Sequence, residues 1–191
     1  GLPEAHFARA QAALNAAEWR RGVAEADKAL DLRPDWDLAV MLKAQLQRAD
    51  SPEAAIETLR SYLAGHPQAR EVRLQYARNL VGARKFSQAR TEFQRLLGDF
   101  PGNVDVIYAV AVLSVQLSDW EAAEENFKKL EFCLGTLTNE QREAVKLFYL
   151  DGKCYNEIVE ITGQEWNQVR SFIQNGRRNL KLCMENEKLN V

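Results

Sequence analysis

The sequence has few of the residues that build disulfide frameworks or metal sites. Its three cysteines, Cys133, Cys154 and Cys183, are far apart and form no CxxC pair, and its only histidines are His6 and His66. Three cysteines cannot make a full disulfide framework, which favours a reducing compartment. Cysteines and histidines this dispersed do not have the spacing of zinc ligands. We therefore expect neither a metal nor a cofactor.

Long apolar runs, excess charge and catalytic motifs are also lacking. The longest apolar stretch, residues 106–115, lies between Asp105 and Asp119. It is shorter than the roughly 20 residues that span a bilayer, so it predicts a buried helix and no membrane contact. The net charge of −2 excludes a wholly basic protein but allows a locally basic face. Without a Gly-rich phosphate loop, an HExxH motif or a nucleophile elbow, the sequence does not predict an enzyme.

The composition changes near residue 130. Residues 1–130 contain 24 alanines, whereas residues 131–191 contain one, Ala144. All three cysteines follow the change. The shift predicts two modules, 1–130 and 131–191, and it leaves open the hypothesis that they were joined artificially into a chimera.

The first module repeats with a period near 34 residues, the spacing expected of stacked helix pairs. Small residues recur in two registers: Ala10, Ala44, Ala77 and Ala111, then Gly22, Ala55, Ala89 and Ala123. Aromatic residues and prolines recur as well: Trp19, Phe86 and Trp120, then Pro34, Pro67 and Pro101. We expect the small residues where two helices cross closely and the aromatic residue filling the gap beside the turn. Proline then ends the second helix of each pair.

These residues resemble the tetratricopeptide repeat family over about residues 3–130. The repeats are 3–36, 37–69, 70–103 and 104–130; the family's Trp-Leu-Gly start is missing, and the second repeat is one residue short around Asp50-Ser51-Pro52. The resemblance implies a concave groove, formed by the first helices, that binds a peptide or a partner protein. The groove candidates are Arg9, Lys43, Arg73, Asn79 and Tyr108; for any single one of them, a solvated helix face is the favoured alternative.

The second module reads as further helices, so the predicted fold is all-α. The last repeat helix continues through Lys128–Leu134 to a break at Gly135-Thr136, and Thr138 with Gln141 forms a capping box for a helix over Asn139–Leu150. A short helix from Tyr155 ends at Gly163, and a longer one covers about Glu165–Met184. Two helices joined by a tight glycine turn, the second longer and basic, indicate a helix-turn-helix.

Charge is concentrated near the end of this module. Between Thr162 and Cys183 four cations face one acid, Glu165, for a net +3. Amide and guanidinium groups pair with base edges in the major groove, and cations also bind phosphates. The alternative is a polar surface helix with favourable cations at its C-terminal end.

Residues 137–143, 148–158 and 175–180 resemble region 4 of the sigma-70 family, in its extracytoplasmic-function type, over about residues 130–185. The resemblance implies that the last helix recognises the promoter −35 element. It also implies docking on the RNA polymerase β-subunit flap, an anti-sigma factor as a further partner, and a bacterial cytoplasmic location. By position, the base-facing candidates are Trp166, Asn167, Gln168, Ser171, Gln174 and Asn175. The phosphate candidates are Lys153, Tyr155, Arg170, Arg177 and Arg178.

Two departures from that family concern the helix-turn-helix itself: Val159 replaces the usual alanine at the helix crossing, and Glu165 replaces a serine-like cap. Region 2 of the family has no counterpart in residues 1–130, so this chain is not expected to start transcription alone. Some sigma factors carry tetratricopeptide repeats after region 4, whereas here the order is reversed, which again favours a joined or excised chain. Two other functions stay open: a module for protein contacts only, and a different helix-turn-helix regulator such as a response-regulator output domain.

Overall fold

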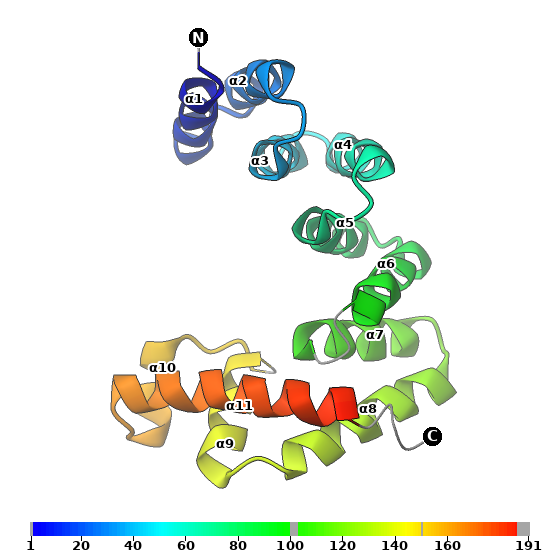
Figure 1. The fold of residues 1–191 in the computed structure, drawn as a ribbon, viewed down its shortest axis with the longest axis vertical. Helices are drawn as coiled ribbons and strands as arrows, with labels where there is room; N and C mark the ends of the chain where they lie inside the picture. The colour runs from blue at the N-terminus through cyan, green and yellow to red at the C-terminus, as the bar shows by residue number, and fades with distance from the viewer. Residues whose placement is uncertain (1, 100–102, 150, 187–191) are drawn as a thin grey trace. The chain divides into compact units, whose positions relative to one another are not determined.

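A computed structural model describes residues 2–99, 103–149 and 151–186, and all the regular structure in these ranges is α-helical (Figure 1). The expected all-α fold is confirmed. Pro101 and Leu150, which the sequence analysis used as helix boundaries, lie outside the described residues. None of the described helices is long and apolar enough to cross a membrane.

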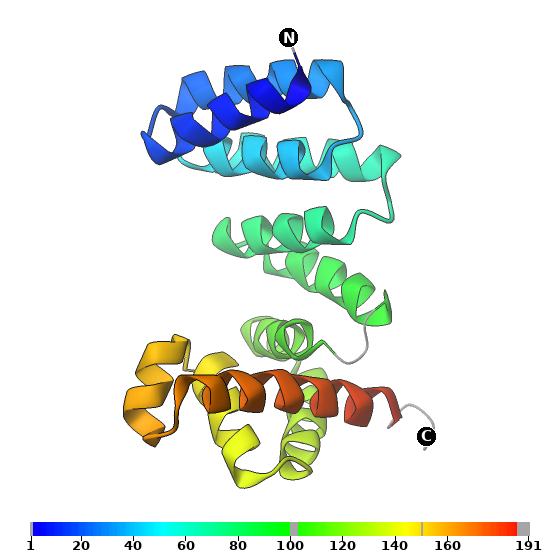
Figure 2. The same ribbon diagram turned by 60° about the vertical axis from the view of Figure 1, so that its left-hand side comes forward.

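The first eight helices form the four expected antiparallel pairs (Figures 1 and 2). They are α1 (Pro3–Asn15) with α2 (Trp19–Leu32), α3 (Asp37–Arg48) with α4 (Pro52–Gly65), α5 (Arg70–Gly82) with α6 (Phe86–Asp99), and α7 (Val104–Gln116) with α8 (Trp120–Gly135). Residue contacts divide the chain into two compact units, 1–92 and 93–191. The composition change near residue 130 therefore falls within α8, inside the second unit.

Small residues make the close crossings within each pair. Both registers of small residues are buried, and Ala10, Ala44, Ala77 and Ala111 have no exposed surface. A Cβ placed on Gly22 of α2 would lie 3.3 Å from Cβ of Ala13 in α1 and 2.5 Å from Cδ2 of Leu46 in the next pair, so the small residue allows a close approach on both sides. The gap-filling role expected of the aromatic position is wrong for Trp120, because 64% of this residue is exposed.

Three of the tight turns inside the pairs use an L-residue in the left-handed conformation. Ala17, Arg84 and Ser118 occupy equivalent positions and have φ values of 56°, 57° and 57°. In each turn the next N–H bonds back to a carbonyl of the first helix, as when Lys85 donates to Leu80 over 2.9 Å. The shortened second repeat uses a different turn, in which the Ser51 hydroxyl caps α4 by accepting from the N–H of Ala54.

The second unit adds α9 (Asn139–Tyr149), α10 (Tyr155–Thr162) and α11 (Trp166–Asn186) to α7 and α8. Helix α11 contacts all four of the others. Its first half packs into a core of Ala144, Ile158, Val169 and Ile173. Its second half packs into another core, built with the last repeat pair and containing Ile107, Leu130, Cys133, Leu134, Leu137, Val145, Leu180 and Met184. The helix-turn-helix is thereby joined to the last repeat by a shared apolar core.

Helix α8 runs unbroken through residues 128–134, as expected, and its C-terminal end is fixed by Arg142 of α9. The Arg142 guanidinium donates to the carbonyl oxygens of Leu134, Gly135 and Leu137 at 2.9–3.1 Å. These bonds satisfy carbonyls that a helix end leaves unpaired. The sequence pattern does not predict this contact.

The structure corrects the view of the cysteines as widely separated thiols. Cys133 of α8 and Cys183 of α11 form a disulfide across 50 residues of sequence. The physical reason is that the chain turns back at α9 and α10, which brings α11 alongside α8. Cys154 stays an exposed free thiol.

We predict that Arg84→Gly stabilises the repeat module by about 1 kcal/mol, because an L-residue in the left-handed conformation costs roughly that much and glycine does not. Urea unfolding measures the change. The control is Ser87→Gly, at an exposed position in the first turn of α6. This variant should destabilise the repeat module by about 0.5–1 kcal/mol. The explanation is wrong if both glycines destabilise the protein alike.

Candidate nucleic-acid interface

The turn between α10 and α11 is fixed by local polar contacts. Glycine is required at residue 163, whose φ is +68°, and its N–H closes α10 on the carbonyl of Val159. At the start of α10 the carboxylate of Glu157 accepts from the N–H of Cys154 at 2.7 Å. This bond, and the neighbouring Lys153, hold the pKa of Glu157 below its ordinary value.

Helix α11 buries one side and exposes the other. The buried side carries Val169, Ile173, Gly176, Leu180 and Met184, at helical spacing. Since successive residues are rotated by about 100°, the opposite side presents four exposed polar residues in a line. They are Asn167, Ser171, Gln174 and Arg178.

The two edges of this exposed side differ in chemistry. One edge carries the cations Arg170, Arg177 and Lys181, and the other carries the amides Gln168, Asn175 and Asn179, all exposed. Cations concentrated on a single edge have the arrangement that one phosphate backbone would require, whereas the central line is mostly uncharged.

The predicted site residues thus gather on one surface, with some differences in exposure. Every candidate from Trp166 to Arg178 is exposed, whereas Lys153 and Tyr155 are part-buried. The Lys153 ammonium also lies 3.6 Å from the Glu157 carboxylate, an ion pair that competes with a phosphate contact.

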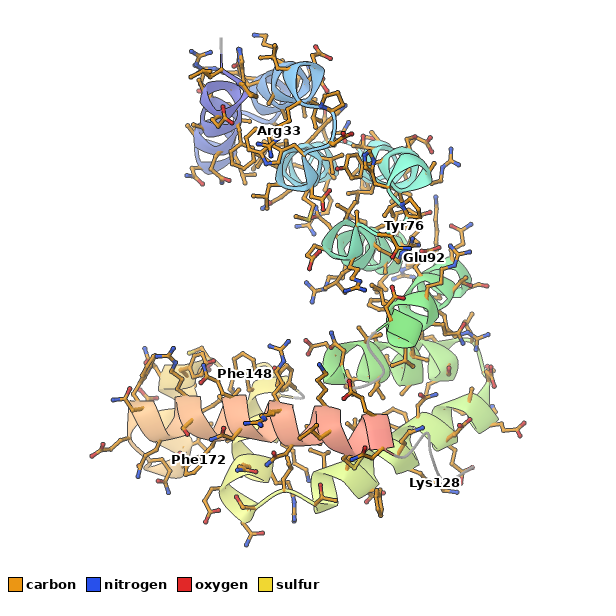
Figure 3. The ribbon with its side chains drawn as sticks, viewed as in Figure 1. Arg33, Tyr76, Glu92, Lys128, Phe148 and Phe172 are labelled. Atoms are coloured by element: carbon orange, nitrogen blue, oxygen red, sulfur yellow. A yellow bond between two sulfur atoms is a disulfide. The ribbon has the colours of Figure 1, made fainter. Side chains whose placement is uncertain are left out.

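Aromatic rings support the cationic edge of α11. Phe148 of α9, labelled in Figure 3, lies 5.4 Å from the Tyr155 ring, and Tyr155 lies 5.6 Å from the Trp166 ring, between centroids. The Arg170 guanidinium stands 5.9 Å from the centre of Trp166, a cation–π arrangement. Burial raises the pKa of Tyr149, and the neighbouring Arg177 partly opposes this rise. The rings therefore hold Arg170 and Arg177 beside the helix-turn-helix core.

One base-facing candidate already has a structural role. The side-chain oxygen of Gln168 accepts the N–H of Glu165 at 3.0 Å, capping the start of α11 where the sequence lacks a serine-like residue. The expected capping box at α9 is half formed: the Gln141 N–H donates to the Thr138 hydroxyl, while the Gln141 side-chain oxygen accepts from Asn179.

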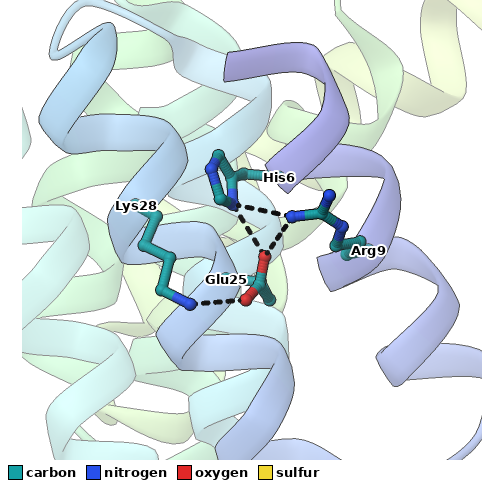
Figure 4. A network of polar contacts seen from close by, with 4 residues as sticks. All are labelled: His6, Arg9, Glu25 and Lys28. Carbon is teal, nitrogen blue, oxygen red and sulfur yellow. Dashed lines mark hydrogen bonds and ion pairs between the residues drawn. The ribbon is translucent and has the colours of Figure 1, made fainter. Parts of the chain in front are cut away.

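Several groove candidates of the repeat module are held by acids on the second helices. Figure 4 shows Glu25 accepting from His6 and Lys28, each at 2.7 Å, with Arg9 at 3.5 Å. Hydrogen bonds from Lys28 and then His6 lower the pKa of Glu25 to about 2. Lys43 pairs with Asp27 at 2.6 Å.

The other groove candidates are also engaged within the fold. Arg73 pairs at 2.6 Å with Glu92, labelled on α6 in Figure 3, and Asn79 is buried with its amide on the carbonyl of Gln75. Tyr108 packs edge-on against Phe127. A groove of about 310 Å³ nevertheless opens between α3 and α5, and its lining includes Asn79. The other lining residues are Met41, Gln45, Arg48, Glu71, Leu74, Gln75 and Arg78.

Residues 127–180 match the family model described as sigma-70, region 4. This confirms the resemblance to region 4 read from the sequence, and the matched segment contains α9, α10 and the part of α11 up to residue 180. A search among curated proteins found no match.

The similar solved structures are repeat proteins. MamA 41-end from Desulfovibrio magneticus RS-1 has 21% identity and a TM-score of 0.56, covering 66% of this chain and 72% of that one. MamA AMB-1 has 20% identity and a TM-score of 0.56, covering 66% and 69%. A tetratricopeptide repeat protein from Parabacteroides merdae ATCC 43184 has 16% identity and a TM-score of 0.62, covering 96% and 73%. These identities show the fold alone, and that fold confirms the helical repeats.

The region 4 segment depends on one close helix crossing. A Cβ placed on Gly176 of α11 would lie 2.6 Å from Cγ2 of Val145, which is buried in α9. Sequence reasoning gave roles to Asn175, Arg177 and Arg178 but no packing role to Gly176, which it named only as part of the family motif. Periodicity alone could have found it, because position 176 falls on the apolar side of α11.

We predict that Gly176→Ala destabilises the second unit by about 1–3 kcal/mol through overpacking against Val145. Hydrogen exchange of the α9 and α11 amides measures this. Gly98→Ala, where an added Cβ meets nothing within 4 Å, is the control and should stabilise slightly. The loss should shrink in a Val145→Ala background; a loss of equal size in both backgrounds would contradict the crossing.

Proposed function

We propose that residues 131–191 form the promoter −35 recognition module of an extracytoplasmic-function sigma factor, and that residues 1–130 form a protein-interaction scaffold. The observation that carries the proposal is the exposed polar side of α11 within a segment that matches sigma-70 region 4. In this proposal α11 lies in the major groove, as the second helix of a helix-turn-helix does.

The chemistry of α11 supports separate roles for its residues. Arg170, Arg177, Arg178 and Lys153 neutralise phosphates. Tyr155 is a further phosphate candidate on the same side of α11. The amides of Gln174 and Asn175 are suited to adenine edges, and Ser171 to either member of a base pair. Trp166 and Asn167 stand at the start of the helix, where base contacts of such helices concentrate.

The partners follow from this assignment. We propose the β-subunit flap of RNA polymerase and an anti-sigma factor as protein partners of the region 4 segment, in a bacterial cytoplasm. The groove between α3 and α5 would take a peptide or a partner protein. The chain acts in binding, without a catalytic step of its own.

The shared core of α7, α8 and α11 bears on the chimera hypothesis. Side chains of the last repeat pair and of the region 4 segment fill one apolar cluster, which favours two modules adapted to each other. Aligning each module separately against genomes tests this: a single natural gene covering both would rule out artificial joining.

A second function, protein binding without DNA binding, is favoured by one observation: Lys153, a phosphate candidate, is engaged in an ion pair with Glu157 within the fold. A pull-down with the β flap in the absence of DNA separates the two functions. Capture of the flap by a chain that binds no duplex would support the second function. A dimer on palindromic duplexes would instead indicate a different helix-turn-helix regulator.

We predict that Arg170→Ala lowers the slope of log affinity against log salt concentration by about 0.9, because one phosphate contact is lost. Anisotropy titration on the duplex selected from a pool randomised over the −35 segment measures the slope. Arg60→Ala is the matched control, because Arg60 is an exposed arginine of α4 paired with Glu57. An unchanged slope for Arg170→Ala would exclude a phosphate contact there.

We predict a different signature for Gln174→Ala. Loss of a base contact should reduce discrimination between the selected and scrambled duplexes by about 1–3 kcal/mol while leaving the salt slope unchanged. Competition titrations with single-position variants of the selected duplex locate the affected base pair. A uniform loss on all duplexes would assign Gln174 to the backbone.

A further inference from the structure

The disulfide between Cys133 and Cys183 lies where the last repeat helix meets the DNA-facing helix. Cys133 belongs to α8 and has no exposed surface, whereas Cys183 lies near the end of α11 and is part-buried. Arg178, the last DNA candidate, precedes Cys183 by five residues on the same helix. The bond therefore fixes the second half of α11 to α8, beyond the segment proposed to touch DNA.

Apolar side chains surround the two sulfur atoms. Leu130, Leu134, Leu180 and Met184 pack there from both helices, and Val145 adds a contact from α9. Buried thiols behave as small apolar side chains, so the same cluster can close over two reduced cysteines. Both redox states are thus compatible with the fold, and they differ in whether α11 is covalently held.

We propose that Cys133 and Cys183 form a reversible dithiol–disulfide site that controls how firmly the second half of α11 is held on the last repeat. The consequence for DNA rests on the proposed function. That function places the protein among reducing thiols, where disulfides are transient and redox-sensing. The third cysteine, Cys154, is exposed and forms no disulfide, so the chain carries a free thiol in addition to this pair.

The difference in burial assigns an order to the exchange. A small-molecule disulfide of the oxidised-glutathione class reacts first with the Cys183 thiolate, forming a mixed disulfide and releasing one small thiol. The Cys133 thiolate then displaces the second small thiol and forms the S–S bond. Two protein thiols lose two electrons and two protons, and the oxidant becomes two small thiols. Reduction begins by attack on the more accessible Cys183 sulfur.

Holding the end of α11 should also order the cations near it. Lys181 lies two residues before Cys183, and Arg177 and Arg178 lie within the two preceding turns. A helix end held by apolar contacts alone opens more readily than one held by a covalent bond. Ordering these side chains before binding lowers the entropic cost of phosphate contacts.

The test uses the full chain in a Cys154→Ser background, so that only the paired cysteines react. Hydrogen exchange is compared after equilibration with oxidised and with reduced glutathione. We expect amides of residues 180–186 to exchange about tenfold faster in the reduced protein, with the α10 amides unchanged as the internal reference. Equal exchange of residues 180–186 in both states would overturn the proposal.

Two further variants test the order of exchange in the same background. Cys133→Ser should trap one glutathione on Cys183, detected by intact mass, about tenfold faster than Cys183→Ser traps it on Cys133. Comparable rates would overturn the assignment of Cys183 as the first sulfur. The exchange experiment keeps both native sulfur atoms, so it stands even if a serine variant folds poorly.

The DNA measurement separates this proposal from the proposed function. Oxidised protein should bind the selected duplex about threefold more tightly than reduced protein. The Cys183→Ser variant should bind as the reduced protein does, whatever the redox state of the solution. If exchange and trapping behave as expected and no duplex binds in either state, the thiol site holds and the DNA-binding function fails. Equal DNA affinity in both states overturns the link between the thiol pair and DNA.

Discussion

The structure of the second unit depends on one helix serving two cores. The first half of α11 closes the small helix-turn-helix core, and its second half closes the core of the last repeat pair. Gly176 lies where the two halves meet, and it lets α9 approach closely enough for Ala144 and Val145 to enter different cores. A short helix-turn-helix has little apolar surface of its own to bury. The repeat supplies the missing surface, and α11 in turn covers the apolar end of the repeat stack, as a terminal cap must.

This sharing determines what is rigid around the proposed DNA surface. Helix α8 does not stop at the end of the repeat, and Arg142 ties its last carbonyls to α9. The disulfide links α8 covalently to α11 as well. The polar side of α11 is exposed because the opposite side of the helix is buried in both cores. Exposure of that side is therefore a consequence of packing in this unit and needs no separate explanation.

Much of this fold could be predicted from the sequence because the determining contacts are local or periodic. Alanines at a 34-residue spacing predict helix crossings, and Gly163 predicts the end of α10, since both effects act within one helix pair or one turn. The contacts that sequence reasoning missed are those set by tertiary placement. Arg142 reads as one of many surface cations, and Cys133 and Cys183 read as distant, until α11 is known to lie beside α8. The left-handed residue Arg84 was missed for a different reason, because the usual glycine is absent.

The candidate DNA residues were predicted as a set, but the structure distinguishes them by which hydrogen-bonding groups are already used within the fold. The Gln168 oxygen is used to cap α11, so this side chain retains N–H donors and has lost the paired donor and acceptor that adenine recognition needs. Gln174, on the central line of the exposed side, has no such engagement among the described contacts. In the proposed complex, the cations on one edge contact phosphate regardless of sequence. If α11 binds DNA as proposed, the cationic edge carries the affinity, and discrimination between sequences falls to the central line of Asn167, Ser171 and Gln174, where the Ser171 hydroxyl also accepts a hydrogen bond from Asn175.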